Sequence, residues 1–136
     1  MTISYRRFLN EVFIIFLTFI SIAASFYVSE VLNITPCILC WVQRILMILI
    51  FLIIILQRII TLKYIYIFSI IGCLVALYHI IIQTLQINTA TCNIKGNSCN
   101  KVEFEIFGFI TMPMLSLLVF LIITCLIYFL DSSKSS

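Results

Sequence analysis

Charged side chains are scarce in this sequence: they make up only 10% of its 136 residues, against about 25% in a typical soluble domain. Apolar residues reach 64%, which excludes an ordinary soluble domain, and the length leaves room for no more than one domain. The formal net charge is +3. Its basic residues are dispersed, with no basic stripe interleaved with aromatic rings, so a nucleic-acid-binding protein is also disfavoured.

Proline is rare as well, and its only two positions, Pro36 and Pro113, each stand at the start of an apolar run. Proline suits the first residue of a helix, because the N–H that it lacks has no helical partner there. Thr35 is then the expected N-cap of the second run. Runs long enough to span a bilayer, which takes about 20 residues, are expected at about 12–32, 36–56, 64–85 and 113–130. The sequence therefore predicts an all-α membrane protein, a four-transmembrane-helix bundle that forms one integral domain over residues 1–136.

The basic residues near the ends of these runs predict the orientation in the membrane, because cytoplasmic loops are enriched in Lys and Arg. One side would hold Arg6, Arg7, Arg58, Lys63 and Lys134, and the other side only Lys95 and Lys101. Both termini are therefore expected to be cytoplasmic. The start of the second span and a loop over about residues 86–112 would then face the opposite, oxidising side. The first run is longer than the usual 7–15 apolar residues of a signal peptide, which disfavours cleavage.

Four of the six cysteines fall on the outer face in this orientation, as two pairs. Cys37 and Cys40 form a CxxC motif at the start of the second span, and Cys92 and Cys99 flank a Gly-Asn turn in the loop. Both pairs have a structural interpretation as disulfides, although closing so short a CxxC loop removes little chain entropy. The helix N-terminus favours thiolate, the reactive species, so a redox role is favoured for CxxC. The two cysteines within spans are interpreted as small apolar side chains: Cys73 and Cys125.

Two ionisable side chains lie within the predicted spans. Arg44 shares a helix face with Cys40, one turn away, where burying a cation costs at least about 2.5–3.5 kcal/mol. Either it extends to the headgroups, or it stabilises negative charge at Cys40 or on a polar ligand there. His79, the single histidine, either bonds a neighbouring helix or shares a polar site with Arg44.

Several stretches together resemble the DsbB/BdbC family of membrane thiol-disulfide oxidoreductases: "PCILCWVQR", "YHIIIQ", the outer cysteine pair and "GFITMPMLSLL". They cover nearly the whole chain, and the compact loop is similar to that of the shorter BdbC-type members. The resemblance implies an enzyme of the bacterial cell membrane that reoxidises an extracytoplasmic thioredoxin-fold disulfide oxidase (DsbA/BdbD-like). The resemblance further implies that this enzyme passes the electrons to a membrane quinone, menaquinone rather than ubiquinone, and so supports disulfide bond formation in exported proteins.

The resemblance also implies roles for individual residues. Cys92 and Cys99 match the loop pair that exchanges with the partner, and Cys37 matches the cysteine that exchanges with the loop. Cys40 matches the cysteine that faces the quinone, with Arg44 and, as a weaker match, His79 binding the cofactor.

Three alternatives remain open at this point. A relative of vitamin K epoxide reductase is disfavoured, because in that family the loop pair precedes the CxxC. A non-enzymatic membrane subunit with structural disulfides is the second alternative. A zinc site of four thiolates is the third, but nothing in the sequence favours a metal over disulfides on an oxidising face.

Overall fold

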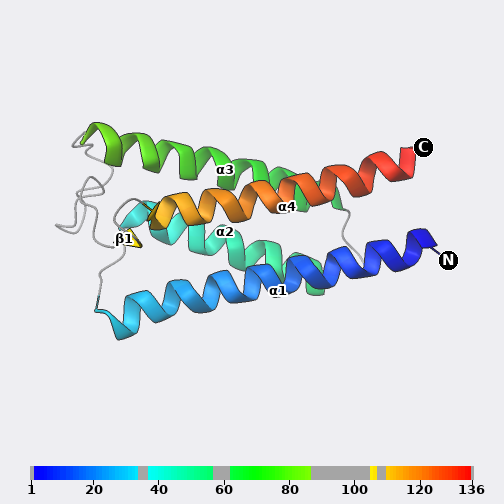
Figure 1. Ribbon diagram of the computed structural model, residues 1–136, viewed down its shortest axis with the longest axis horizontal. Helices are drawn as coiled ribbons and strands as arrows, with labels where there is room; N and C mark the ends of the chain where they lie inside the picture. The colour runs from blue at the N-terminus through cyan, green and yellow to red at the C-terminus, as the bar shows by residue number, and fades with distance from the viewer. Residues whose placement is uncertain (1, 34–36, 57–61, 87–104, 107–109, 136) are drawn as a thin grey trace.

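The computed structural model describes residues 2–33, 37–56, 62–86, 105–106 and 110–135. It consists of four helices that are long and apolar enough to cross a membrane, together with one pair of two-residue strands. The prediction of an all-α bundle of four transmembrane helices is therefore confirmed. The helices lie side by side, and the start of α1 and the end of α4 lie at the same end of the bundle (Figure 1). The cytoplasmic placement of that end stays a prediction.

Helix α1 (Thr2–Val31) begins well before the apolar run expected at 12–32. Its added first turns carry charges that suit water rather than lipid, and Arg7 Nε pairs with Glu11 Oε1 at 3.0 Å across one turn. A helix continues past the apolar segment wherever its polar residues retain helix propensity. Just beyond its end, Asn33 has φ 52°, a left-handed conformation that asparagine tolerates better than most residues.

Helix α2 (Ile38–Ile55) starts two residues later than the proline expected to open it, and Cys37 is its N-cap, with φ −72° and ψ 170°. The prediction that Thr35 caps this helix and that Cys37 lies in its first turn is wrong. Thr35 and Pro36 themselves lie outside the described residues. The first helical hydrogen bond, 3.1 Å long, runs from Trp41 N to Cys37 O. Cys37 therefore lies just before the positive end of the helix dipole, where a thiolate is still favoured.

Helices α3 (Leu62–Leu85) and α4 (Met112–Ser135) pack closely against one another through small side chains of α3. Ser69 Oγ donates a 2.9 Å hydrogen bond to Phe120 O and lies 2.7 Å from Thr124 Oγ1. Any Cβ added at Gly72 would overlap the Phe120 ring. Small residues and hydroxyl hydrogen bonds are the usual means of bringing helices together in lipid, where burial of apolar surface gives no driving force.

The buried core lies between all four helices and is almost wholly aliphatic, with Phe120 as its largest side chain. Large apolar side chains elsewhere on the helices are exposed, as expected of surfaces that face lipid. Strands β1 (Glu105–Ile106) and β2 (Ile110–Thr111) pair antiparallel and lead into α4. Pro113 is the second residue of α4, in the first turn as expected. The start of α2, the end of α3 and the start of α4 therefore meet at one end of the bundle (Figure 1).

Candidate active site

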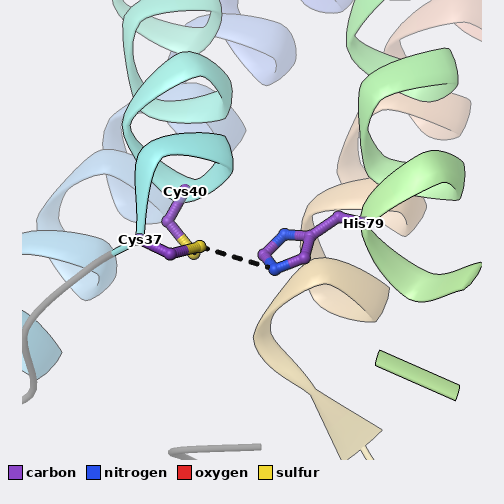
Figure 2. A group of neighbouring side chains, drawn as sticks. All are labelled: Cys37, Cys40 and His79. Carbon is purple, nitrogen blue, oxygen red and sulfur yellow. Dashed lines mark hydrogen bonds between the residues drawn. The ribbon is translucent and has the colours of Figure 1, made fainter. Parts of the chain in front are cut away.

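A dithiol and an imidazole meet at this end of the bundle. Cys37 and Cys40 come from the start of α2, and His79 reaches toward them from α3 (Figure 2). The Cys37 and Cys40 sulfur atoms are 3.3 Å apart, and the Cys37 sulfur is 3.5 Å from His79 Nε2. Both cysteines are free thiols. Their proximity follows from the CxxC spacing, which places the N-cap side chain and a first-turn side chain on the same side of the helix.

The thiol of Cys37 is strongly acidified in this arrangement. Its pKa is lowered from 9.0 to about 4, chiefly because the Cys40 thiol hydrogen-bonds to it and, to a smaller extent, because His79 does so. Burial acts in the opposite direction without overcoming these bonds. Cys37 is therefore largely a thiolate at neutral pH, and the thiolate is the form that reacts in disulfide exchange.

Two polar residues that the sequence analysis did not single out connect His79 to α4. Gln43 Nε2 lies 3.5 Å from His79 Nδ1, and Ser116 Oγ donates a 2.8 Å hydrogen bond to Gln43 Oε1. His79 is 1% exposed and Gln43 6% exposed. A polar amide inside a membrane span must find partners within the bundle, and this requirement was the available sequence signal for Gln43.

Arg44 is 6% exposed and is held by α1. Its Nε and Nη2 donate to the side-chain and main-chain oxygens of Ser25, both at 3.0 Å. The guanidinium carbon lies 4.5 Å from the ring centre of Phe26 and 5.1 Å from that of Trp41. Within the described part of the chain Arg44 makes no hydrogen bond to His79, so the two do not meet directly in a shared polar site. They approach the dithiol from different helices.

The other four cysteines are not part of the dithiol and imidazole cluster that the structure describes. Cys92 and Cys99 lie outside the described residues, so their predicted roles stay predictions. Cys73 is a half-buried free thiol on α3, and Cys125 is an exposed free thiol on α4. Their interpretation as small apolar side chains also stays a prediction.

The same three side chains have the proximity that a metal ion would need. One ligand atom each from Cys37, Cys40 and His79 lies within 4.8 Å of the other two. A histidine that ligates a metal usually donates its second ring N–H to a carboxylate or carbonyl oxygen. Here Nδ1 faces the amide nitrogen of Gln43 instead. The surroundings of the imidazole therefore favour thiol chemistry at this site.

Comparison with known proteins agrees with this geometry. The family described as "Disulfide bond formation protein DsbB" matches residues 6–130. The chain is 39% identical to the SPbeta prophage-derived disulfide bond formation protein B of Bacillus subtilis, over 86% of this chain and 83% of that protein. It is 38% identical to a probable disulfide formation protein of Chlamydia caviae, over 81% and 82% of the two chains. Disulfide bond formation protein C of B. subtilis is 32% identical, over 85% and 88%. No solved structure gives a significant match.

Proposed function

The chain belongs to the DsbB family of disulfide bond formation proteins, and from this premise we propose that it reoxidises an extracytoplasmic thioredoxin-fold oxidase (DsbA/BdbD-like) with a membrane quinone as the electron acceptor. Membership of the family and the four membrane-spanning helices make it a multi-pass membrane thiol-disulfide oxidoreductase. Beyond this, we propose that the enzyme lies in the bacterial cell membrane, that its active cysteines face outward, and that it acts on this partner and this acceptor. The observation that carries it is the meeting of three side chains at one end of the bundle, with the Cys37 sulfur 3.3 Å from the Cys40 sulfur and 3.5 Å from His79 Nε2.

The proposed relay consists of two exchanges between dithiols and disulfides. The reduced partner's thiolate attacks the Cys92–Cys99 disulfide, and resolution of the mixed disulfide leaves the partner oxidised and the loop reduced. The loop dithiol then reduces the Cys37–Cys40 disulfide in the same way. Each exchange transfers two electrons and two protons, so nothing accumulates. The loop thiolate attacks the Cys37 sulfur and releases Cys40. Cys37, which holds its negative charge at neutral pH, is then the leaving sulfur when the second loop thiolate resolves this mixed disulfide, and the attacking sulfur when the CxxC disulfide closes.

The residues around Arg44 fit a quinone. Two of the three guanidinium nitrogens are bound by Ser25. The third has no partner among the described residues, so it can donate to a carbonyl oxygen. Phe26 and Trp41, which flank the guanidinium, are 40% and 48% exposed on the lipid-facing surface and offer flat apolar contacts. Arg44 would hold the head group beside Cys40; contact with His79 stays a prediction. A bound quinone would supply the two-electron acceptor that returns the CxxC dithiol to a disulfide.

Energetics favour an acceptor of this kind. A DsbA-like partner has a reduction potential of about −120 mV, whereas an oxidising glutathione pool stands at roughly −180 to −210 mV. At about 1.4 kcal/mol per 30 mV for two electrons, glutathione falls short by roughly 3 kcal/mol. A partner of this type therefore needs a stronger oxidant, and a lipid-soluble one reaches Arg44 sideways through the bilayer.

Thiol trapping in membranes tests the proposed function. Membranes that contain quinone should keep the outer cysteines oxidised, whereas membranes depleted of quinone should accumulate reduced Cys37 and Cys40. Cys40→Ser should leave the partner reduced in cells, while Cys125→Ser, a substitution of an exposed thiol away from the site, should not. A protein whose cysteines stay oxidised without quinone would be a structural subunit with bracing disulfides, and the proposal would fail.

A further inference from the structure

The imidazole at the dithiol is part of a chain of polar groups that crosses three helices. It runs from the Cys37 sulfur through His79 and the side-chain amide of Gln43 to the hydroxyl of Ser116 on α4. Each link is buried or half-buried, and each lies at the end of the bundle where α2, α3 and α4 meet. Cys37 and His79 already have roles in the proposed relay, whereas Gln43 and Ser116 have none.

We propose that Gln43 and Ser116 are positioning residues that hold His79 in the neutral tautomer with its proton on Nε2, so that the ring donates a hydrogen bond to the Cys37 sulfur. The catalytic consequence rests on the proposed function, but the tautomer itself does not. A neutral imidazole has one donor and one acceptor nitrogen, and its neighbours decide which is which.

The orientation of the Gln43 amide is set by Ser116. The hydroxyl lies 2.8 Å from Gln43 Oε1 and 2.9 Å from Pro113 O. In a helix the Pro113 carbonyl also accepts an N–H from the next turn, whereas Oε1 is buried and depends on the hydroxyl. The hydroxyl therefore donates to Oε1, which otherwise lacks a donor, rather than to the Pro113 carbonyl, which already has one. The amide nitrogen is then the atom that faces His79.

An amide N–H that faces a ring nitrogen requires that nitrogen to be the acceptor. Gln43 Nε2 lies 3.5 Å from Nδ1, so Nδ1 carries the lone pair and the ring proton resides on Nε2. Nε2 in turn lies 3.5 Å from the Cys37 sulfur. The ring therefore donates to the sulfur, and it opposes a second proton on Nδ1, because two N–H groups would then face one another. A donor at this place stabilises Cys37 whenever it carries negative charge, both as leaving sulfur and as nucleophile.

Among the described residues, no other nearby group gives a competing reason for this tautomer. The ionisable groups on the facing side of α2 are Cys37 and Cys40, with Arg44 one turn farther along and bonded to α1. The stretch of α4 from Met112 to Thr124 carries no titratable side chain. Among the residues that the structure describes, the amide of Gln43 is thus the group that contacts Nδ1.

The single histidine of the chain makes the tautomer directly measurable. The reduced, full-length protein is labelled with ¹⁵N-histidine, placed in nanodiscs, and its one imidazole observed by NMR. The wild-type ring should give a protonated Nε2 and an unprotonated Nδ1. Ser116→Ala should convert this spectrum into a mixture of tautomers, and Ser116→Thr, which restores the hydroxyl, should restore it. Ser69→Ala, which removes a buried hydroxyl elsewhere between α3 and α4, should leave it unchanged.

A glutamate at position 43 should reverse the arrangement. In Gln43→Glu a carboxylate faces Nδ1 and accepts a hydrogen bond from it, so the ring should carry its proton on Nδ1 instead of Nε2. The donor to Cys37 is then lost, and kcat for partner oxidation should fall at least about tenfold, the effect expected for one hydrogen bond to a charged group, with KM for the partner unchanged. An unchanged kcat would refute the catalytic consequence.

Two results would overturn the inference: a wild-type ring protonated on Nδ1, which means that the amide has the opposite orientation, or a tautomer that Ser116→Ala does not change. Failure of the proposed function looks different. In that case the ring would show the expected tautomer and its dependence on Ser116, while the protein would oxidise no partner.

Discussion

The reactivity of Cys37 toward an alkylating reagent should be nearly independent of pH across a range in which an ordinary thiol loses it. With its pKa lowered from 9.0 to about 4, the side chain is a thiolate at pH 6 in about 99% of molecules, against about 0.1% for an unperturbed thiol. Thiolates of low pKa are intrinsically weaker nucleophiles, with a Brønsted slope of about 0.4–0.5. Over the drop in pKa this slows the thiolate itself by about 200-fold.

These two effects nearly cancel in the rate but not in its pH dependence. At pH 6 Cys37 should react only about fivefold faster than an ordinary thiol, the ratio of about 10³ in thiolate to about 200 in nucleophilicity. The sign of the shift sets the profile: a depressed pKa keeps the charged form present as pH falls, and the form is lost only below about pH 4. The rate should therefore stay level from about pH 9 to about pH 5, whereas an ordinary thiol loses tenfold per unit.

The assay is timed iodoacetamide labelling of the reduced protein at a series of pH values, with mass spectrometry of the Cys37 peptide as the readout. Cys40→Ala should raise the midpoint most, because the Cys40 thiol makes the largest contribution to the shift, and His79→Ala should raise it less. A small-molecule thiol of ordinary pKa, added to the same sample, serves as the reference. A Cys37 rate that falls tenfold per unit below pH 8 would refute the acidified thiol and the role that the relay gives it.

Three further substitutions test the packing of α3 against α4 and the role of the buried Arg44. Gly72→Val should destabilise the bundle by about 1–3 kcal/mol, because the new side chain overlaps the Phe120 ring; thermal unfolding in detergent, with Leu74→Val at an exposed position of the same helix as the control, measures this. Ser69→Ala should cost about 0.6 kcal/mol, the average for a hydrogen bond between membrane helices, and a loss above about 2 kcal/mol by the same assay would contradict that. Arg44→Met should unfold at a similar temperature, since two lost hydrogen bonds are offset by one fewer buried charge, yet bind added quinone at least about tenfold more weakly in a titration; unchanged quinone binding would remove Arg44 from the site.

The fold could be predicted from the sequence because apolar length in a membrane protein leaves few choices. Every backbone polar group must be satisfied within the span, so a run such as that around Ile50 must be helical. Helix ends were less predictable, since the start of α2 depends on how the chain enters the helix at Cys37, a local detail that proline and threonine preferences do not determine.

The site was predictable in its chemistry and less so in its contacts. Cys37, Cys40, Arg44 and His79 stand out because thiols and ionisable groups are costly or unusual in a span. Which of them touch depends on helix rotation and crossing, which periodicity does not specify. Thus Arg44 turns to Ser25 while His79 turns to Cys37. Gln43 carries no charge and so gives a weaker sequence signal than these residues, although its burial makes it just as dependent on partners.

The central claim is that electrons leave the Cys37–Cys40 dithiol for a quinone in the membrane. Its most direct measurement is anaerobic: the purified protein in nanodiscs with menaquinone receives a reduced thioredoxin-fold oxidase, and quinol and oxidised partner are counted together. We predict one quinol for each partner molecule oxidised, and neither product with Cys40→Ser. Partner oxidation without quinol, or quinol formation that persists in Cys40→Ser, would contradict the account.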